Sequence, residues 1–217
     1  APTSTFFNRA CIQVDDAKIC NVAKEVSGRY MTPMQLLEHS LNTGAVWVLE
    51  QLGGGQINLA GRQKFYRYLV DNYRLNAPTG IQLANEVDSV IFKPNTPNGA
   101  RVLYANMSFG QGEQLTMIQV VSAFSAVING GKYYQPTIVA GVINDTGEYI
   151  VASEKEPTGQ IVKAETSATM RQMMSQSRKA DGTGRTDRIG FEVGGKTGTS
   201  ETLRDGTYIK TQTIASY

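Results

Sequence analysis

The sequence predicts an α/β fold of the α+β type, in which helices and antiparallel hairpins occupy separate stretches of one domain. Apolar residues recur at helical spacing in five segments, and paired apolar runs joined by turn residues occur in three others. The composition agrees, because 41% hydrophobic and 18% charged residues over 217 positions are ordinary for a folded globular protein. No repeat, low-complexity tract or clear linker divides residues 1–217, so a single domain is expected.

Five helices are expected in chain order. Thr32, followed by a proline, suits the N-cap of a short helix that runs to about His39 and delivers Ser40 at or just past its end. A largely buried helix is expected over Gly44–Leu52, where three glycines stop it. The remaining helices are expected over Gly61–Tyr73, Leu115–Ile128 and Ala164–Gln176.

The first expected hairpin covers residues 12–19 and places the two cysteines opposite each other. If Asp15 and Asp16 form its two-residue turn, Cys11 faces Cys20 in a non-hydrogen-bonded pair. Such pairs bring Cα atoms to about 4.5 Å, at the near edge of the range for a disulfide. Both a bridge and two free, packed cysteines fit this arrangement.

Two further hairpins are expected in the second half of the chain. One joins Ile138–Ile143 to Glu148–Ala152 through the turn sequence at 144–147. The other joins a strand over 191–200 to a returning strand over Thr207–Tyr217, with a turn near residues 204–206.

Charge and hydropathy exclude several classes of function. The net charge of +2 comes from scattered charged residues, which indicate neither a basic nucleic-acid-binding surface nor a basic membrane-binding surface. No apolar run approaches the roughly 18 residues of a spanning helix, and the first residues do not resemble a secretion signal. Any targeting information is therefore expected outside this chain. His39, the only histidine, has no set of ligands at metal-binding spacing, so we expect no metal and no cofactor.

Two short polar motifs carry the expected chemistry: Ser40-Leu41-Asn42 and, about 150 residues downstream, Lys196-Thr197-Gly198-Thr199. A serine hydroxyl both accepts and donates, so Ser40 can pass a proton between a lysine and a leaving amine. The Asn42 amide suits a backbone amide of a substrate. The ammonium of Lys196 can tune a neighbouring group and, with Thr197 and Thr199 on one face of a strand, can hold a carboxylate.

The glycines around Lys196 favour a substrate lying along this strand. Gly194, Gly195 and Gly198 lack Cβ atoms, so a peptide could approach closely as an added antiparallel strand. The N–H of Thr199 would then be available to an oxyanion.

The two motifs match two of the three motifs of serine acyl-transferases that attack D-alanyl peptides and β-lactams. The third, Ser-x-x-Lys, is absent, because no serine of the chain has a lysine three positions on. More broadly, the chain resembles the transpeptidase domain of class B penicillin-binding proteins in its stretches 39–46, 64–68, 78–81, 108–112, 129–132 and 195–200.

This resemblance implies a serine D,D-transpeptidase that cross-links peptidoglycan stem peptides ending in D-Ala-D-Ala and binds β-lactams. It implies an extracytoplasmic protein, anchored to the membrane by one amino-terminal helix and working in a cell-wall synthesis complex. Ser40 and Asn42 would form the second motif and Lys196, Thr197 and Gly198 the third. Thr199 would be a carboxylate ligand and an oxyanion donor.

The implied fold is that of penicillin-binding transpeptidases and serine β-lactamases, an antiparallel sheet of five strands flanked by helices. Residues 1–217 would be a truncated domain, its central and distal part, with the nucleophile segment before Ala1 and the final strand after Tyr217. The chain would then supply only the Lys196 strand and its neighbour. Two strands make a poor sheet, so a missing segment or another chain is expected to complete it.

Two other functions share these motifs. A serine β-lactamase or D,D-carboxypeptidase would hydrolyse the acyl-enzyme instead of transferring it. A β-lactam sensor or a scaffold without catalysis would bind the ligand, or a partner, with no turnover.

Overall fold

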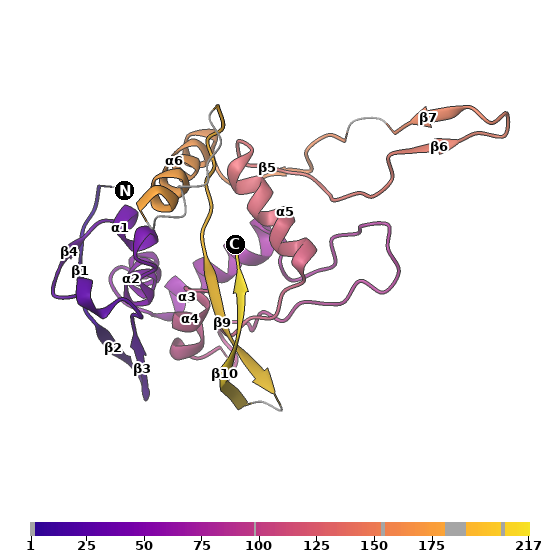
Figure 1. The fold of residues 1–217 in the computed structure, drawn as a ribbon. Coiled ribbons are helices and arrows are strands. Elements are labelled where there is room, and N and C mark those ends of the chain that lie inside the picture. Colours follow the sequence, from indigo (N-terminus) through magenta and orange to yellow (C-terminus); the bar gives the residue numbers. More distant parts are fainter. Residues whose placement is uncertain (1–2, 98, 153–154, 181–189, 205–206) are drawn as a thin grey trace. The chain divides into compact units, whose positions relative to one another are not determined.

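The computed structural model describes residues 3–97, 99–152, 155–180, 190–204 and 207–217 (Figure 1). The chain divides into two compact units. The first unit comprises Ala1–Gln63, Pro94–Gly112 and Arg171–Tyr217, and the second comprises Lys64–Lys93 and Glu113–Met170.

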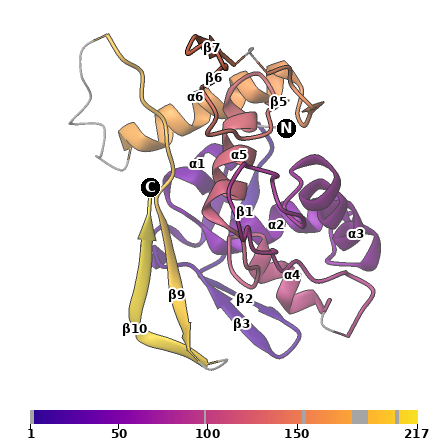
Figure 2. The same cartoon turned by 90° about the vertical axis from the view of Figure 1, so that its right-hand side faces the viewer.

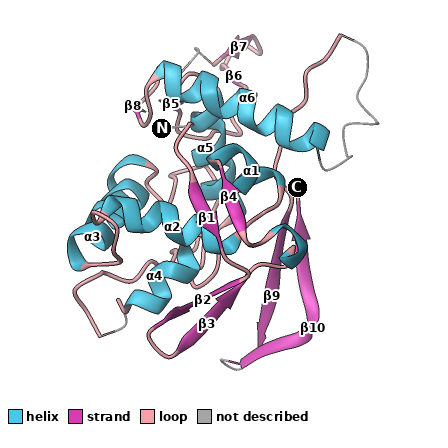
Figure 3. Cartoon of the chain, turned by 90° about the vertical axis from the view of Figure 1, so that its left-hand side faces the viewer, coloured by secondary structure: helices cyan, strands magenta, loops and turns pink. Residues whose placement is uncertain are grey.

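Helices and antiparallel strands of three to ten residues make up the first unit (Figures 2 and 3). Its strands are β1 (Phe6–Asn8), β2 (Cys11–Val14), β3 (Ala17–Cys20), β4 (Arg29–Met31), β9 (Gly198–Arg204) and β10 (Thr207–Ser216). Its helices are α1 (Pro33–Glu38), α2 (Asn42–Leu52) and α4 (Arg101–Met107), with a 3-10 turn at Lys24–Val26. The strands pair only in twos, as β1–β4, β2–β3 and β9–β10, and each pair is antiparallel. These pairs confirm the expected α+β class.

The core of the first unit lies between the β1–β4 pair and the first two helices. Strand β1 buries alternate side chains, so Phe6 points inward and Phe7 outward. Phe6 packs with Val26, Met31 and Leu41 and stacks on the Trp47 ring at a centroid distance of 5.1 Å, while Leu36 packs against the same cluster. This cluster fixes the end of α1 and the start of α2, where Ser40 and Asn42 lie.

Helix α1 begins as the sequence predicts. The Thr32 hydroxyl accepts from the N–H of Gln35, and the Gln35 side chain accepts from the N–H of Thr32, which completes a capping box. The following helix begins at Asn42, two residues before the expected Gly44.

The disulfide between Cys11 and Cys20 is formed, with the two Cα atoms 4.0 Å apart. The register of β2 and β3 pairs these residues directly and pairs Val14 with Ala17 beside the turn, as expected from the sequence. In the loop-entropy description, closing a loop of about ten residues stabilises the fold by about 2.5 kcal/mol. The bridge thus ties the end of β3 to the start of β2.

The strand expected to carry Lys196 is shorter than predicted. We expected it over 191–200, but residues 191–197 are irregular and β9 begins at Gly198. Strand β10 pairs with β9 from Thr207 to Ser216, with a register shift between Ile209 and Thr213. Residues 205 and 206 of the expected turn lie outside the described residues. The pair remains two-stranded in the described part of the chain, as the resemblance implied.

The second unit packs around α5 (Met117–Ile128), where Ala126, Tyr133 and Ile161 form a buried cluster. The Arg74 guanidinium lies over the Tyr133 ring, 4.7 Å from its centroid. The other elements of this unit are β5 (Lys132–Tyr133), β6 (Gly141–Ile143), β7 (Tyr149–Val151) and β8 (Gly159–Gln160), paired as β5–β8 and β6–β7. The β6–β7 hairpin was predicted, although its strands are shorter than the expected Ile138–Ile143 and Glu148–Ala152.

Helices α3 (Leu59–Arg67) and α6 (Ala164–Ala180) contain boundaries between the two units. A π-helical turn, Tyr68–Asn72, follows α3, so the expected helix over Gly61–Tyr73 is real but changes its hydrogen-bond pattern. Helix α4 and the strands β1, β4, β5 and β8 were not predicted, since such short elements show no measurable periodicity. Among the described residues, no helix is both long and apolar enough to cross a bilayer.

Candidate active site

Ser40 occupies a strained turn that ends α1. Its φ is +50°, in the left-handed region where a side chain is unfavourable. The Ser40 N–H donates to the Leu37 carbonyl at 3.3 Å, and the Leu41 N–H donates to the Leu36 carbonyl at 3.0 Å. These two bonds define a Schellman motif, a position at which glycine is usual. Leu41 belongs to the buried cluster and Leu36 packs against that cluster, which agrees with the apolar contact that often accompanies this motif. The turn leaves the Ser40 side chain exposed.

Lys196 reaches Ser40 from a residue 156 positions away. Its Nζ donates to Ser40 Oγ at 2.9 Å, and also to the carbonyl of Thr197 at 2.8 Å and to Thr197 Oγ1 at 3.3 Å. All three partners are oxygen acceptors, which suits an ammonium. Since Ser40 Oγ accepts from Lys196, its own hydrogen is available to a third group. The structure therefore brings together the two residues that the sequence nominated for proton relay.

Asn42 is the first residue of α2, and its side chain is held by the disulfide hairpin. Its Nδ2 donates to the carbonyl of Cys20 at 3.0 Å. This bond fixes which way the amide faces, because the flipped amide would set its oxygen against the carbonyl. The Oδ1 atom and the second N–H of Nδ2 are then the groups with which Asn42 can bind a substrate amide.

The residues after Lys196 differ from expectation in one respect. Thr199 lies in β9 opposite Ala215, and Gly198 lies opposite Ser216. Thr197 precedes the strand, because β9 begins only at Gly198. Thr197 and Thr199 therefore do not lie on one face of a continuous strand, contrary to what the sequence predicted. Instead, Thr197 contacts the Lys196 ammonium through its own carbonyl and hydroxyl.

The glycines of this segment make close contacts within the chain. A Cβ at Gly195 would meet the Tyr217 ring at 2.7 Å, and one at Gly198 would collide with the Ser216 hydroxyl. A Cβ at Gly194 would lie 3.1 Å from the backbone nitrogen of Ser175. Packing of the chain on itself thus explains why these positions lack side chains, and the glycines alone do not indicate a substrate. The edge of β9 away from β10 has no strand partner among the described residues.

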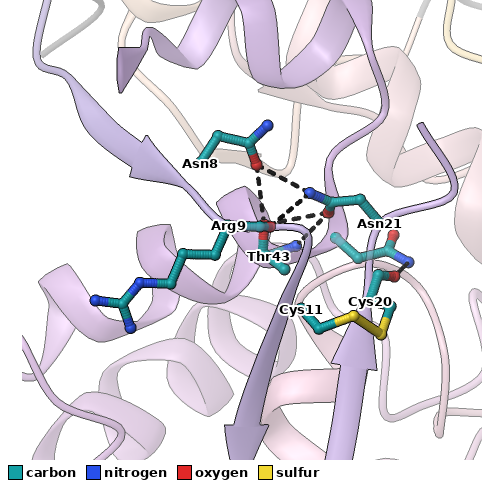
Figure 4. The surroundings of a disulfide bond; sticks show 7 residues. Asn8, Arg9, Cys11, Cys20, Asn21 and Thr43 are labelled. Carbon is teal, nitrogen blue, oxygen red and sulfur yellow. Dashed lines mark hydrogen bonds between the residues drawn. A yellow bond between two sulfur atoms is a disulfide. The ribbon is translucent and has the colours of Figure 1, made fainter. Parts of the chain in front are cut away.

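A buried polar network that no sequence pattern predicted lies behind the turn formed by Ser40, Leu41 and Asn42. Asn8, Asn21 and Thr43 are all nearly inaccessible to solvent and bond to one another (Figure 4). The sequence does not predict this network, because the three residues are widely separated and match no motif. Among the described residues, no group of three metal-ligating side chains comes together.

The strained turn at Ser40 leads to a prediction with opposite signs for stability and activity. Replacing Ser40 with glycine relieves a left-handed residue, which outweighs the added entropy of the unfolded chain, so we expect a gain of about 0.5 kcal/mol in unfolding free energy. The same change removes the hydroxyl that Lys196 contacts, and acylation by a β-lactam is expected to fall about a hundredfold in the full-length protein. Denaturant unfolding and acylation kinetics measure the two effects.

Ser40→Ala is the matched control, because it removes the hydroxyl and keeps the unfavourable φ. It should lose as much activity as Ser40→Gly without the gain in stability. A glycine variant that is less stable than the alanine variant would contradict the assignment of strain.

The family model described as the penicillin-binding protein transpeptidase domain matches residues 2–217. Stage V sporulation protein D of Bacillus subtilis is 32% identical over 214 residues, which are 98% of this chain and 31% of that protein. A protein of Neisseria flavescens named probable peptidoglycan D,D-transpeptidase PenA is 27% identical over 118 residues, which are 54% of this chain and 27% of that protein. The chain thus spans about a third of the length of these relatives.

Solved structures give the same fold. Penicillin-binding protein 3 of Mycobacterium tuberculosis superposes with a TM-score of 0.80 at 22% identity, over 99% of this chain and 47% of that one. The same protein has also been solved in complex with aztreonam and with ampicillin. Together with the match over residues 2–217, this likeness shows that the chain belongs to the family of penicillin-binding protein transpeptidase domains.

Proposed function

We propose that this chain is the proton-relay and substrate-seating part of a serine D,D-transpeptidase that cross-links peptidoglycan stem peptides. The observation that carries the proposal is the 2.9 Å contact between Lys196 Nζ and Ser40 Oγ, which joins the two motifs across 156 positions. The nucleophilic serine and its lysine would lie on a Ser-x-x-Lys segment outside these 217 residues, since no such motif occurs in them.

The proposed reaction has two acyl transfers. The serine oxygen attacks the carbonyl of the penultimate D-Ala of a donor peptide, an ester forms, and the terminal D-Ala leaves as its amine. Ser40 passes the proton lost by the attacking serine hydroxyl to that amine. The Lys196 ammonium stabilises this proton transfer and the carboxylate of the substrate. The amine of a second stem peptide then attacks the ester, which releases the serine and forms the cross-link. No cofactor or metal is required at any step.

The remaining site residues would seat the donor peptide. Asn42 would bind a backbone amide through its side-chain amide, with Nδ2 already anchored on Cys20. Thr197 and Thr199 would add hydroxyl ligands for the carboxylate next to Lys196, and the N–H of Thr199 would donate to the oxyanion. Gly198 lies between them at the start of β9, whose edge away from β10 would receive the peptide as an added strand.

The relatives support the broader part of this proposal. One of them is named a probable peptidoglycan D,D-transpeptidase, and a structural relative has been solved in separate complexes with aztreonam and with ampicillin. We extend both properties to the full protein that contains this chain. It would act outside the cytoplasm, anchored to the membrane within a cell-wall synthesis complex that serves cell division or cell shape. A segment outside residues 1–217, or another chain, would complete the sheet that begins with β9 and β10.

Mass spectrometry with a β-lactam tests whether the nucleophilic serine lies outside residues 1–217. The full-length protein should gain the mass of one ring-opened β-lactam on a serine, and residues 1–217 alone should gain none. A stoichiometric adduct on residues 1–217 alone would contradict the proposal that the nucleophile lies outside them. Rapid turnover of the β-lactam by the full protein would instead favour a β-lactamase, and an adduct without any transfer to an amine would favour a sensor.

A further inference from the structure

We propose that Thr43 and Asn21 are positioning residues for the acyl transfer, holding Asn42 in the orientation that binds the amide of the substrate. This inference rests on the proposed function. The start of α2 lacks the usual polar N-cap side chain. The N-cap residue is Leu41, whose apolar side chain cannot cap the helix and is buried in the core instead. An N–H donor in the first turn therefore needs a partner from elsewhere.

Asn21, the residue after β3, supplies that partner. Its Oδ1 accepts from the N–H of Thr43 at 2.9 Å, 22 residues away in the chain. The preceding residue, Cys20, accepts from Asn42 Nδ2 through its carbonyl. Two consecutive residues of the hairpin thus bind two consecutive residues of the helix, and the disulfide ties the same stretch to β2.

Asn21 is itself held rigidly. Its Nδ2 donates to Asn8 Oδ1 at 2.9 Å and to the Arg9 carbonyl at 3.0 Å, so both of its N–H groups are used (Figure 4). Asn8 in turn donates to the carbonyl of Val26 at 3.1 Å. Asn8 is 0% exposed and Asn21 is 1% exposed, so water does not compete for these bonds.

The Thr43 hydroxyl lies at the centre of the network. It faces three acceptor oxygens, Asn8 Oδ1 at 3.2 Å, the Arg9 carbonyl at 3.0 Å and Asn21 Oδ1 at 3.1 Å. With a single proton it donates to one of them at a time. Each of the three already accepts from another donor, so loss of the hydroxyl leaves no buried oxygen without a partner. The hydroxyl therefore contributes more to fixing the position of the α2 terminus than to the stability of the fold.

The test compares two β-lactams on the full-length protein. Benzylpenicillin carries a side-chain amide that Asn42 would bind, whereas 6-aminopenicillanic acid has a free amine there. We expect Thr43→Val to lower the second-order acylation rate constant about tenfold for benzylpenicillin, the worth of one hydrogen bond, and by less than threefold for 6-aminopenicillanic acid. Thr43→Ser keeps the hydroxyl and should restore both rates.

Ile161→Val is the control for a general loss of stability, since it removes one buried methylene in the core of the second unit. It should acylate like the wild type with both compounds. Equal losses with the two β-lactams, or no loss with either, would overturn the positioning role. If Thr43→Val does not fold, Thr43→Ala is measured against the same criteria. A wild-type protein that neither compound acylates would instead refute the proposed function itself.

Discussion

Replacing Lys196 with alanine is expected to lower the acylation rate of the full-length protein by a β-lactam about a thousandfold. The change removes the donor to Ser40 Oγ and the positive charge beside the proposed carboxylate site. Loss of one acid–base or charge-stabilising group typically costs a factor of 10² to 10⁴. Stopped-flow or gel-based kinetics with a fluorescent penicillin would measure it.

The fold should tolerate this substitution, because the hydrogen bonds from Lys196 to Ser40 and Thr197 lie at the exposed surface. We expect the free energy of unfolding to change by less than about 1 kcal/mol. Lys163→Ala removes an exposed lysine of the second unit and should leave acylation unchanged. Acylation of the Lys196→Ala variant within threefold of the wild-type rate would exclude Lys196 from the site.

A β-lactam whose carboxylate is esterified separates the two roles of Lys196. In the wild type, esterification should slow acylation strongly, since the ammonium loses its charged partner. In Lys196→Ala the ester and the free acid should react at similar rates. A variant that still prefers the free acid as strongly as the wild type would show that Lys196 does not bind the carboxylate.

Replacing Glu113 with glutamine is expected to stabilise the protein above neutral pH. Burial raises the pKa of the Glu113 carboxyl to about 7, and its Oε2 atom is buried without a hydrogen-bond partner among the described residues. The folded pKa thus exceeds the unfolded value of 4.5, so the folded state binds the proton more tightly. The contribution of this group is fully present below the unfolded pKa and is lost as the pH rises through about 7.

The shift corresponds to about 3 kcal/mol, since each pKa unit is worth about 1.4 kcal/mol. Relative to the glutamine variant, the wild type should therefore lose about 3 kcal/mol of unfolding free energy between pH 4.5 and 8. Urea unfolding of both proteins across this range would show it. Glu156→Gln, an equal charge change at an exposed position of the same unit, should show no such difference. Parallel pH profiles for wild type and Glu113→Gln would contradict the raised pKa.

Local signals in the sequence predicted much of the fold. Three features depend on a few neighbouring residues each, and the structure contains all of them: the N-cap at Thr32, the opposed cysteines and the turn at 144–147. The strand predicted over residues 191–197 was wrong, because the alternation of Phe191 and Val193 with Glu192 is typical of a strand but only pairing with a neighbouring strand makes one. The β1–β4 pair was missed because it joins residues 6–8 to residues 29–31 through non-local bonds.

The sequence by itself determined which residues we propose for the chemistry: the serine and asparagine of one motif, and the lysine and threonines of the other, in the order in which the family has them. Only the tertiary structure decided that Lys196 touches Ser40 and that Asn42 is anchored on the disulfide hairpin. It also revealed that Ser40 holds a left-handed turn and that Asn21 replaces a local cap for α2. Motifs record residue types along the chain, whereas these contacts join positions from 22 to 156 residues apart, and packing of the core brings such positions together.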